Sequence, residues 1–136
     1  RLVEDISQTV VRELDQIAFI IGDFGLEVEE MLLGVAKEVG AEGLILHQNE
    51  PLGTAHAIYC AKEILRGPIV VAFADTLFRA KFELDLTSDA VIWVSKIKNP
   101  EAFGVVKLDS QGAIEGFVEK PKNFYYQYFF GCFIVP

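Results

Sequence analysis

The amino-acid sequence predicts an α/β fold in which a parallel βαβ half is followed by a mixed or antiparallel extension. Three observations carry this prediction. In the first half, two kinds of segment alternate along the chain. In one kind, apolar residues recur every three or four residues, as in amphipathic helices; the other kind is a short run of apolar, branched residues, as in buried strands. The second half holds further strand-like runs with no room for helices between them. With 51% hydrophobic and 24% charged residues, the 136-residue chain has enough apolar material for one folded core.

The first half predicts strands and helices in strict alternation. Apolar residues recur at helical spacing from Leu2 to Leu14, and Gly40 is a natural stop for a second helix. The expected elements are a helix over 2–14, a strand over 17–22, a helix over 27–39, a strand over 43–48, a helix over 55–65 and a strand over 69–74. This order is the pattern of parallel βαβ units.

The second half changes character from Asp89 onward. The expected strands cover residues 89–97, 104–108, 114–119 and 125–135. The loop from Asp109 to Gly112 predicts a hairpin with glycine where a positive φ is needed. An unrelated module such as a flavodoxin-like domain would need helices throughout, which this half contradicts. No linker or repeat divides the chain, so we expect residues 1–136 to form a single domain.

Composition excludes several classes of function. Twenty acidic and twelve basic residues give a net charge of −8, so the surface does not attract nucleic acid by bulk electrostatics. The longest clean apolar runs fall far short of the roughly 20 residues of a membrane-spanning helix. Cys60 and Cys132 form neither a disulfide framework nor a metal-ligand spacing, and are expected to be reduced core thiols. No signal-peptide pattern is visible, and we expect a cytoplasmic protein.

The segment from Gln48 to His56 lies where a strand ends and a helix begins, which is where open α/β sheets bind ligands. Gly53 permits close approach of the backbone, and Gln48 carries a donor and an acceptor that can pair with the edge of a nucleobase. The same residues also suit an ordinary loop in which Thr54 caps the helix. His47 and His56 have no partner at metal or triad spacing, and we interpret both as structural or supporting residues.

Two further groups of polar residues stand at the ends of strands. Asp75 follows the 69–74 strand, where a carboxylate either holds Mg²⁺ against a phosphate or caps the next turn. Gly104 would let a ligand reach the backbone of an extended strand. Glu119 and Lys120 are expected to point to opposite faces of their strand, with a carboxylate suited to sugar hydroxyls and an ammonium suited to phosphate. The alternative is a polar strand end stopped by Pro121.

Taken together and in this order, these polar segments resemble the motifs of the sugar-1-phosphate nucleotidyltransferases. Their residues are most similar to those of bacterial glucose-1-phosphate thymidylyltransferase-like and uridylyltransferase-like proteins. The resemblance covers essentially the whole chain. It consists of Gln48…Pro51-Leu-Gly-Thr-Ala-His-Ala57, Ala74-Asp-Thr76, Asn99-Pro100 before Phe103-Gly-Val-Val106, Glu119-Lys-Pro121 and a strand containing Gly131. It implies a Rossmann-like mixed sheet of the GT-A-like type.

The resemblance also implies roles for individual residues. On the nucleotide side, the residues expected to bind the nucleobase are Gln48, Gly53 and Thr54. On the sugar side, the residues expected to bind the sugar are Gly104, Glu119 and Gly131. Two catalytic residues are implied: Lys120 would meet the sugar phosphate, and Asp75 would be a ligand of the cofactor Mg²⁺.

The implied reaction joins an NTP, with dTTP or UTP expected, to a sugar 1-phosphate, with glucose 1-phosphate expected, and gives a nucleotide sugar and pyrophosphate. A non-catalytic nucleotide-sugar-binding or regulatory subunit of the same fold is the alternative. The family's Gly-rich triphosphate loop and its second metal-binding Asp are not found in this sequence. We therefore expect the central part of a longer enzyme, inactive alone. The expected partners are the two substrates, not nucleic acid or a membrane, and a homo-oligomer is left open.

Overall fold

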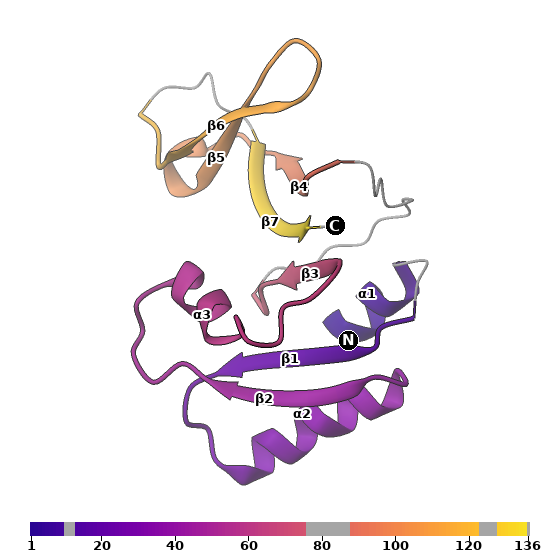
Figure 1. Ribbon diagram of the computed structural model, residues 1–136. Coiled ribbons are helices and arrows are strands. Elements are labelled where there is room, and N and C mark those ends of the chain that lie inside the picture. Colours follow the sequence, from indigo (N-terminus) through magenta and orange to yellow (C-terminus); the bar gives the residue numbers. More distant parts are fainter. Residues whose placement is uncertain (10–12, 76–87, 123–127, 136) are drawn as a thin grey trace. The chain divides into compact units, whose positions relative to one another are not determined.

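The computed structural model describes residues 1–9, 13–75, 88–122 and 128–135, and the structural statements below refer to these residues. They form two compact units (Figure 1). The first unit holds the described residues up to Arg66, and the second holds those from Gly67 onward.

The first unit is built around a parallel βαβ unit (Figure 1). Its elements are α1 (Leu2–Thr9), β1 (Gln16–Ile21), α2 (Leu26–Glu38), β2 (Glu42–His47) and α3 (Thr54–Cys60). Strands β1 and β2 pair in parallel, in a register that runs from Gln16 opposite Glu42 to Ile21 opposite His47. The predicted parallel pairing of these two strands is confirmed.

Small residues let helix α2 approach strand β2 closely. Ala36 of α2 is fully buried, and a Cβ placed on Gly43 of β2 would lie 3.0 Å from the Cβ of Ala36 and 2.9 Å from Cδ2 of Leu33. Gly40 ends this helix at φ +82°, and the N–H of Ala41 donates to the carbonyl of Ala36 at 3.0 Å. This is the glycine-terminated helix end that the sequence predicts.

The second unit is an antiparallel sheet (Figure 1). Its elements are β3 (Ile69–Ala72), β4 (Val91–Lys96), the 3₁₀ turn η1 (Pro100–Ala102), β5 (Gly104–Leu108), β6 (Ile114–Glu119) and β7 (Tyr128–Val135). The strand order is β3-β7-β5-β6, and β4 also pairs with β7. Val105 and Val106 of β5 are buried almost completely. Strand β7 pairs with three other strands, β3, β4 and β5.

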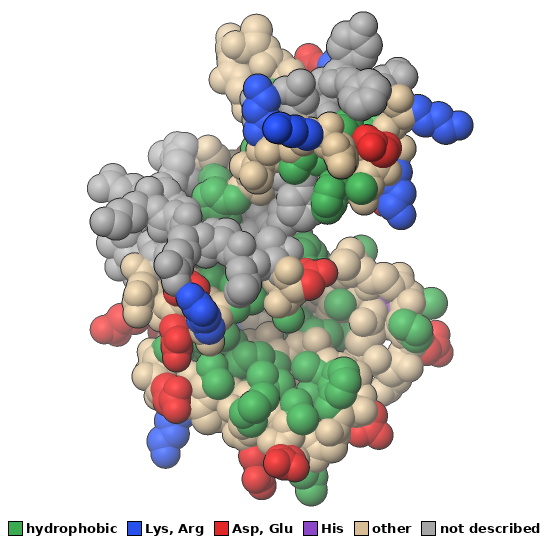
Figure 2. All heavy atoms as spheres, turned by 180° about the vertical axis from the view of Figure 1, so that it is seen from behind, with side chains coloured by type: hydrophobic (Ala, Val, Ile, Leu, Met, Phe, Trp, Pro, Cys, Tyr) green, Lys and Arg blue, Asp and Glu red, His purple; other side chains and the backbone are tan. Residues whose placement is uncertain are grey.

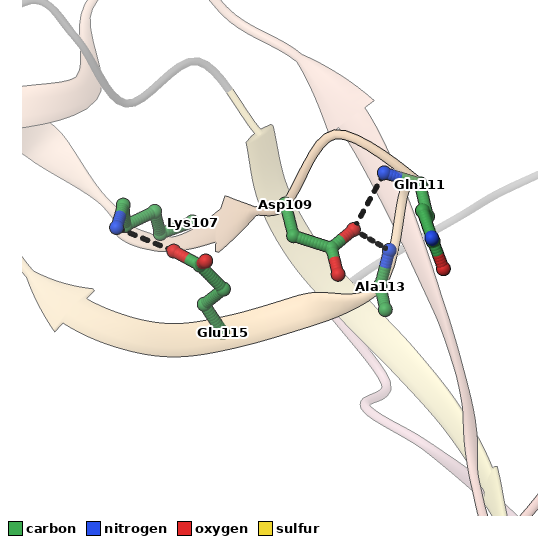
Figure 3. A network of polar contacts seen from close by, with 5 residues as sticks. All are labelled: Lys107, Asp109, Gln111, Ala113 and Glu115. Atoms are coloured by element: carbon green, nitrogen blue, oxygen red, sulfur yellow. Dashed lines mark hydrogen bonds and ion pairs between the residues drawn. The ribbon is translucent and has the colours of Figure 1, made fainter.

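The β5–β6 hairpin is closed by side chains as well as by its backbone (Figure 3). One carboxylate oxygen of Asp109 accepts hydrogen bonds from the backbone N–H groups of Gln111 (2.8 Å) and Ala113 (2.9 Å). Lys107 and Glu115 form an ion pair across the two strands. A short polar side chain that satisfies its own turn is the reason Asp is favoured at this position. The predicted hairpin is confirmed, with Gly112 at φ +86°.

The described core is made of small residues. The buried apolar residues are Ala36, Ala41, Ala61, Val105 and Val106. Larger apolar side chains stay partly exposed, and Figure 2 shows such side chains on one face of the first unit, among acidic ones. No described helix is long and apolar enough to cross a bilayer. Cys60 is a free, half-buried thiol, which is less buried than expected of a core residue; the side chain of Cys132 lies outside the description.

The fold class is confirmed, while the bounds or partners of several elements differ from their predictions. Helix α3 ends at Cys60 instead of residue 65, because the next N–H groups bond three residues back (Ala61 to Ile58, 3.0 Å) and tighten the chain into turns. Strand β3, expected as part of the parallel half, pairs antiparallel with β7, from Ile69 opposite Val135. The predicted helix over 2–14 is wrong at its end, because Glu13 and Leu14 are not helical, and the predicted strand over 69–74 ends at Ala72. Residues 10–12 of that helix and residues 125–127 of the predicted strand over 125–135 lie outside the described residues.

Candidate functional site

The structure brings the predicted nucleobase residues together at the carboxyl end of β2. The backbone N–H of Gln48 donates to the carbonyl of Ile21 at 2.8 Å, so the parallel pairing continues one residue past the strand. The side-chain Nε2 of Gln48 donates to the carbonyl of Gly53 at 3.0 Å and lies 3.1 Å from Nδ1 of His56. The amide is thus held on the loop and on the first turn of α3.

Gly53 takes a conformation that favours glycine. Its φ is +96°, and no described atom lies within 4 Å of a Cβ placed on it. Gly53 occupies the cap position of α3, where no side chain bonds the helix, so Thr54 is not the cap that the alternative of an ordinary loop requires. Thr54 is instead the first residue of α3 and is exposed. Backbone and hydroxyl groups here are open to a ligand.

His56 lies half-buried beside the amide of Gln48. This contact agrees with the expectation of a structural or supporting residue. The position of His56 three residues after Gly53 was a usable signal. One helical turn separates the two residues, so both can face the same side chain.

Lys62 adds a positive charge just after α3. Its Nζ donates to the hydroxyl of Tyr59 at 3.0 Å, and this hydrogen bond raises the pKa of Lys62 above its usual value. The ammonium is therefore charged at neutral pH.

Asp75 lies in an exposed turn three residues after the end of β3 at Ala72. A carboxylate is an oxygen ligand of the kind Mg²⁺ prefers, and Mg²⁺ is commonly held by one or two carboxylates together with substrate phosphates. Among the described residues, no group of three His, Cys, Asp or Glu side chains gathers as a metal site. The chemistry of Asp75 fits an ion that takes most of its ligands from substrate and water.

Three residues of the predicted sugar-phosphate side, Gly104, Glu119 and Lys120, meet at the open end of the β5–β6 hairpin. Gly104 is directly opposite Glu119 in the antiparallel register. The next backbone N–H, of Lys120, donates to the carbonyl of Phe103 at 3.0 Å and closes the pair. The same end of the hairpin therefore holds the backbone of Gly104 and the charged side chains of Glu119 and Lys120.

The directions of Glu119 and Lys120 differ from the prediction. Opposite faces of a strand were expected, yet Nζ of Lys120 lies 3.7 Å from Oε1 of Glu119. The strand ends at Glu119, and Lys120 has φ +43°, a left-handed conformation that is uncommon for a residue other than glycine. This turn of the backbone breaks the alternation of side chains and brings both charges to the same side.

Gly131 stands at an irregularity of strand β7. Trp93 of β4 lies opposite Cys132 and Val94 lies opposite Phe130, so Gly131 is an extra residue on β7. A bulge of this kind bends a strand, and glycine accommodates it most easily. The nucleobase residues thus belong to the first unit, and Asp75, Gly104, Glu119, Lys120 and Gly131 belong to the second.

The fold and these clusters can be set against known proteins. A family model described as "Nucleotidyl transferase" matches residues 1–132, and the chain belongs to this family. It is 35% identical, over 72% of its length and 29% of the relative's, to a mannose-1-phosphate guanylyltransferase catalytic subunit beta of Drosophila melanogaster. It is 31% identical, over 88% of its length and 34% of the relative's, to the low-salt glycan biosynthesis nucleotidyltransferase Agl11 of Haloferax volcanii.

Solved structures share the fold. A crystal structure of a Bacillus anthracis protein assigned as a glucose-1-phosphate thymidylyltransferase, in complex with a sucrose, has a TM-score of 0.77 at 22% identity and covers 98% of this chain and 56% of its own. HddC from Yersinia pseudotuberculosis has a TM-score of 0.69 at 23% identity, covering 99% of this chain and 60% of its own. The chain spans about a third of the length of the two curated relatives.

Proposed function

We propose that the protein is a sugar-1-phosphate nucleotidyltransferase, which converts an NTP and a sugar 1-phosphate into a nucleotide sugar and pyrophosphate. The observation that carries the proposal is the Gln48 amide, held at the carboxyl end of β2 beside Gly53 in a chain of the nucleotidyl transferase family. Gln48, Gly53 and Thr54 would bind the nucleobase. An amide on a loop that follows a parallel strand stands where α/β folds bind nucleotides.

The second unit would supply the sugar-phosphate side. Glu119 would accept hydrogen bonds from sugar hydroxyls, and the ammonium of Lys120 would hold the sugar phosphate. Because the two charged ends are 3.7 Å apart, one ligand with a hydroxyl beside a phosphate could engage both. The backbone of Gly104, opposite Glu119 in the hairpin, and the bulge at Gly131 would complete this side.

The reaction needs positioning and charge neutralisation and no covalent intermediate on the protein. A phosphate oxygen of the sugar 1-phosphate attacks the α-phosphorus of the NTP in line, and the bond to the β-phosphate breaks as pyrophosphate leaves. Lys120 holds the attacking phosphate and offsets its charge as the nucleophile approaches. Asp75 would hold Mg²⁺, whose charge, when it is bound, stabilises the phosphates.

We propose dTTP or UTP as the donor and glucose 1-phosphate as the acceptor. The relative named as a mannose-1-phosphate guanylyltransferase makes GTP and mannose 1-phosphate the first competitors to test.

We further propose that residues 1–136 are part of one nucleotidyltransferase domain and that the protein acts in the cytoplasm. The free thiol of Cys60 is compatible with that compartment. Sedimentation of the purified protein measures whether it forms a homo-oligomer.

A pyrophosphate-release assay on the protein as its gene encodes it tests the proposal. Asp75→Asn keeps the shape of the side chain and removes its charge, so turnover should fall about 100-fold or more while the fold survives. Asp89→Asn, an equal change at another exposed position of the second unit, is the matched control and should keep wild-type turnover. Near-wild-type turnover of Asp75→Asn would make Asp75 a turn residue. Binding of a nucleotide sugar without any turnover would favour the regulatory alternative.

A further inference from the structure

The contacts of the Gln48 side chain settle which way its amide faces. One terminal atom of this amide lies 3.0 Å from the carbonyl oxygen of Gly53 and 3.1 Å from Nδ1 of His56. A carbonyl oxygen only accepts hydrogen bonds, so the atom beside it has to be the NH₂ group of the amide. The same carbonyl accepts from the backbone N–H of Ala57 at 3.1 Å, which fixes the carbonyl in turn.

This orientation determines the state of the His56 ring. An NH₂ group donates, so Nδ1 of His56 has to accept the second hydrogen bond. The ring is then neutral and carries its proton on Nε2. A ring protonated on Nδ1 would place two donors face to face, and the amide would turn over.

Both hydrogens of the Gln48 NH₂ group are used by these two acceptors. The carbonyl oxygen Oε1 is the end of the amide that has no partner among the residues the structure describes. Gln48 and His56 are half-buried, whereas Gly53 and Thr54 are exposed, so the cluster is open to solvent on the side of the loop. A ligand that reaches Gln48 from that side meets an acceptor.

We propose that His56 is a positioning residue that holds Gln48 with Oε1 toward the nucleobase and thereby selects the base; this inference rests on the proposed function. Uracil, thymine and guanine carry an N–H on the ring nitrogen of the pairing edge, and this N–H can donate to Oε1. In adenine and cytosine that ring nitrogen is itself an acceptor and would face the lone pairs of Oε1. The expected donors are therefore UTP, dTTP and GTP, in preference to ATP and CTP.

The test compares two substitutions of His56 with one of His47, the other histidine of the chain. His56→Leu removes the acceptor, while His56→Asn restores one near the position of Nδ1. His47→Leu is the matched control, because the ring of His47 pairs with Glu29 at 3.4 Å. The measurement is the ratio of kcat/KM for the preferred NTP to kcat/KM for ATP.

We expect His56→Leu to lower this ratio about 5- to 10-fold, the equivalent of one hydrogen bond. His56→Asn and His47→Leu should stay within about 2-fold of the wild type, a difference too small for the loss of a hydrogen bond. An unchanged ratio in His56→Leu would overturn the inference and leave the proposed function standing. If His56→Leu does not fold, His56→Gln replaces it, since its amide extends toward the position of Nε2 instead of Nδ1.

Nitrogen NMR of the ring tests the inference without any turnover. In the wild-type protein at neutral pH, Nδ1 of His56 should give the signal of an unprotonated ring nitrogen and Nε2 that of a protonated one. A protonated Nδ1 would overturn the inference whether or not the protein is an enzyme. Absence of nucleotidyl transfer with every NTP, combined with an unprotonated Nδ1, would refute the proposed function and still support the arrangement of His56 and Gln48.

Discussion

Replacing Lys120 by glycine separates the backbone of this residue from its charge. Lys120 has φ +43°, in the left-handed region that glycine enters at little cost. Its N–H donates to the carbonyl of Phe103 at 3.0 Å, and any residue except proline retains this bond. Lys120→Ala and Lys120→Gly both remove the ammonium. Only glycine also removes the steric strain of the left-handed backbone conformation.

The magnitude follows from two contributions. A left-handed conformation costs a residue with a Cβ about 1–2 kcal/mol. Glycine avoids this cost, but it lowers the free energy of unfolding by about 0.5–1 kcal/mol because the unfolded chain is more flexible at a glycine. The ion pair with Glu119 joins side chains that are 65% and 72% exposed, so its loss changes stability little. Lys120→Gly should therefore be more stable than Lys120→Ala by about 1 kcal/mol, or about 4 °C in Tm.

Urea unfolding and the pyrophosphate-release assay together decide this prediction. Both variants should show the same large rise in KM for the sugar 1-phosphate, because both lack the charge that would hold its phosphate. Equal stabilities of the glycine and alanine variants would refute the left-handed backbone at Lys120. A wild-type KM in either variant would remove Lys120 from the sugar-phosphate side.

Three further predictions concern packing, the hairpin and the nucleobase. Gly43→Ala should destabilise the protein by about 1–3 kcal/mol, because its Cβ would lie 3.3 Å from the backbone Cα of Leu33 and even closer to side chains. Gly34→Ala, on the open face of α2, should instead stabilise it by about 0.5–1 kcal/mol, and urea unfolding that ranks the two the other way would refute the α2–β2 packing. Asp109→Ala should cost about 1 kcal/mol in the same assay by freeing two backbone N–H groups, and no change would mean that the turn closes without the carboxylate. Gln48→Ala should weaken NTP binding by about 1–3 kcal/mol in calorimetry, and an unchanged affinity would place the nucleobase elsewhere.

The sequence predicts best the elements that depend on residues close together in the chain, such as the β5–β6 hairpin. Strands 104–108 and 114–119 have the predicted bounds, because alternation and an Asp-to-Gly turn lie within a few residues of one another. The partner of β3 was not predictable in this way. Its apolar residues mark a buried strand but do not say that Ile69 will lie opposite Val135, 66 residues further along the chain.

The same distinction holds for the candidate site. Gln48 and Gly53 follow from the type of residue at a strand end, and the structure places them in contact. The spacing of Gly53 and His56 places them one helical turn apart, but the contact of His56 with Gln48 also depends on how the loop turns into α3, which the sequence does not determine. The shared direction of Glu119 and Lys120 depends on a left-handed φ at a lysine, a conformation that the residue type disfavours.

The most direct test of the proposed function is to follow the phosphorus-containing products of the reaction by ³¹P NMR. The protein is incubated with Mg²⁺, one NTP at a time and a panel of sugar 1-phosphates that includes glucose and mannose 1-phosphate. A sugar-1-phosphate nucleotidyltransferase forms pyrophosphate and a nucleotide sugar in equal amounts, and only when both substrates are present. Release of inorganic phosphate or pyrophosphate from an NTP without a sugar 1-phosphate, or no reaction with any pair, would contradict the proposed function.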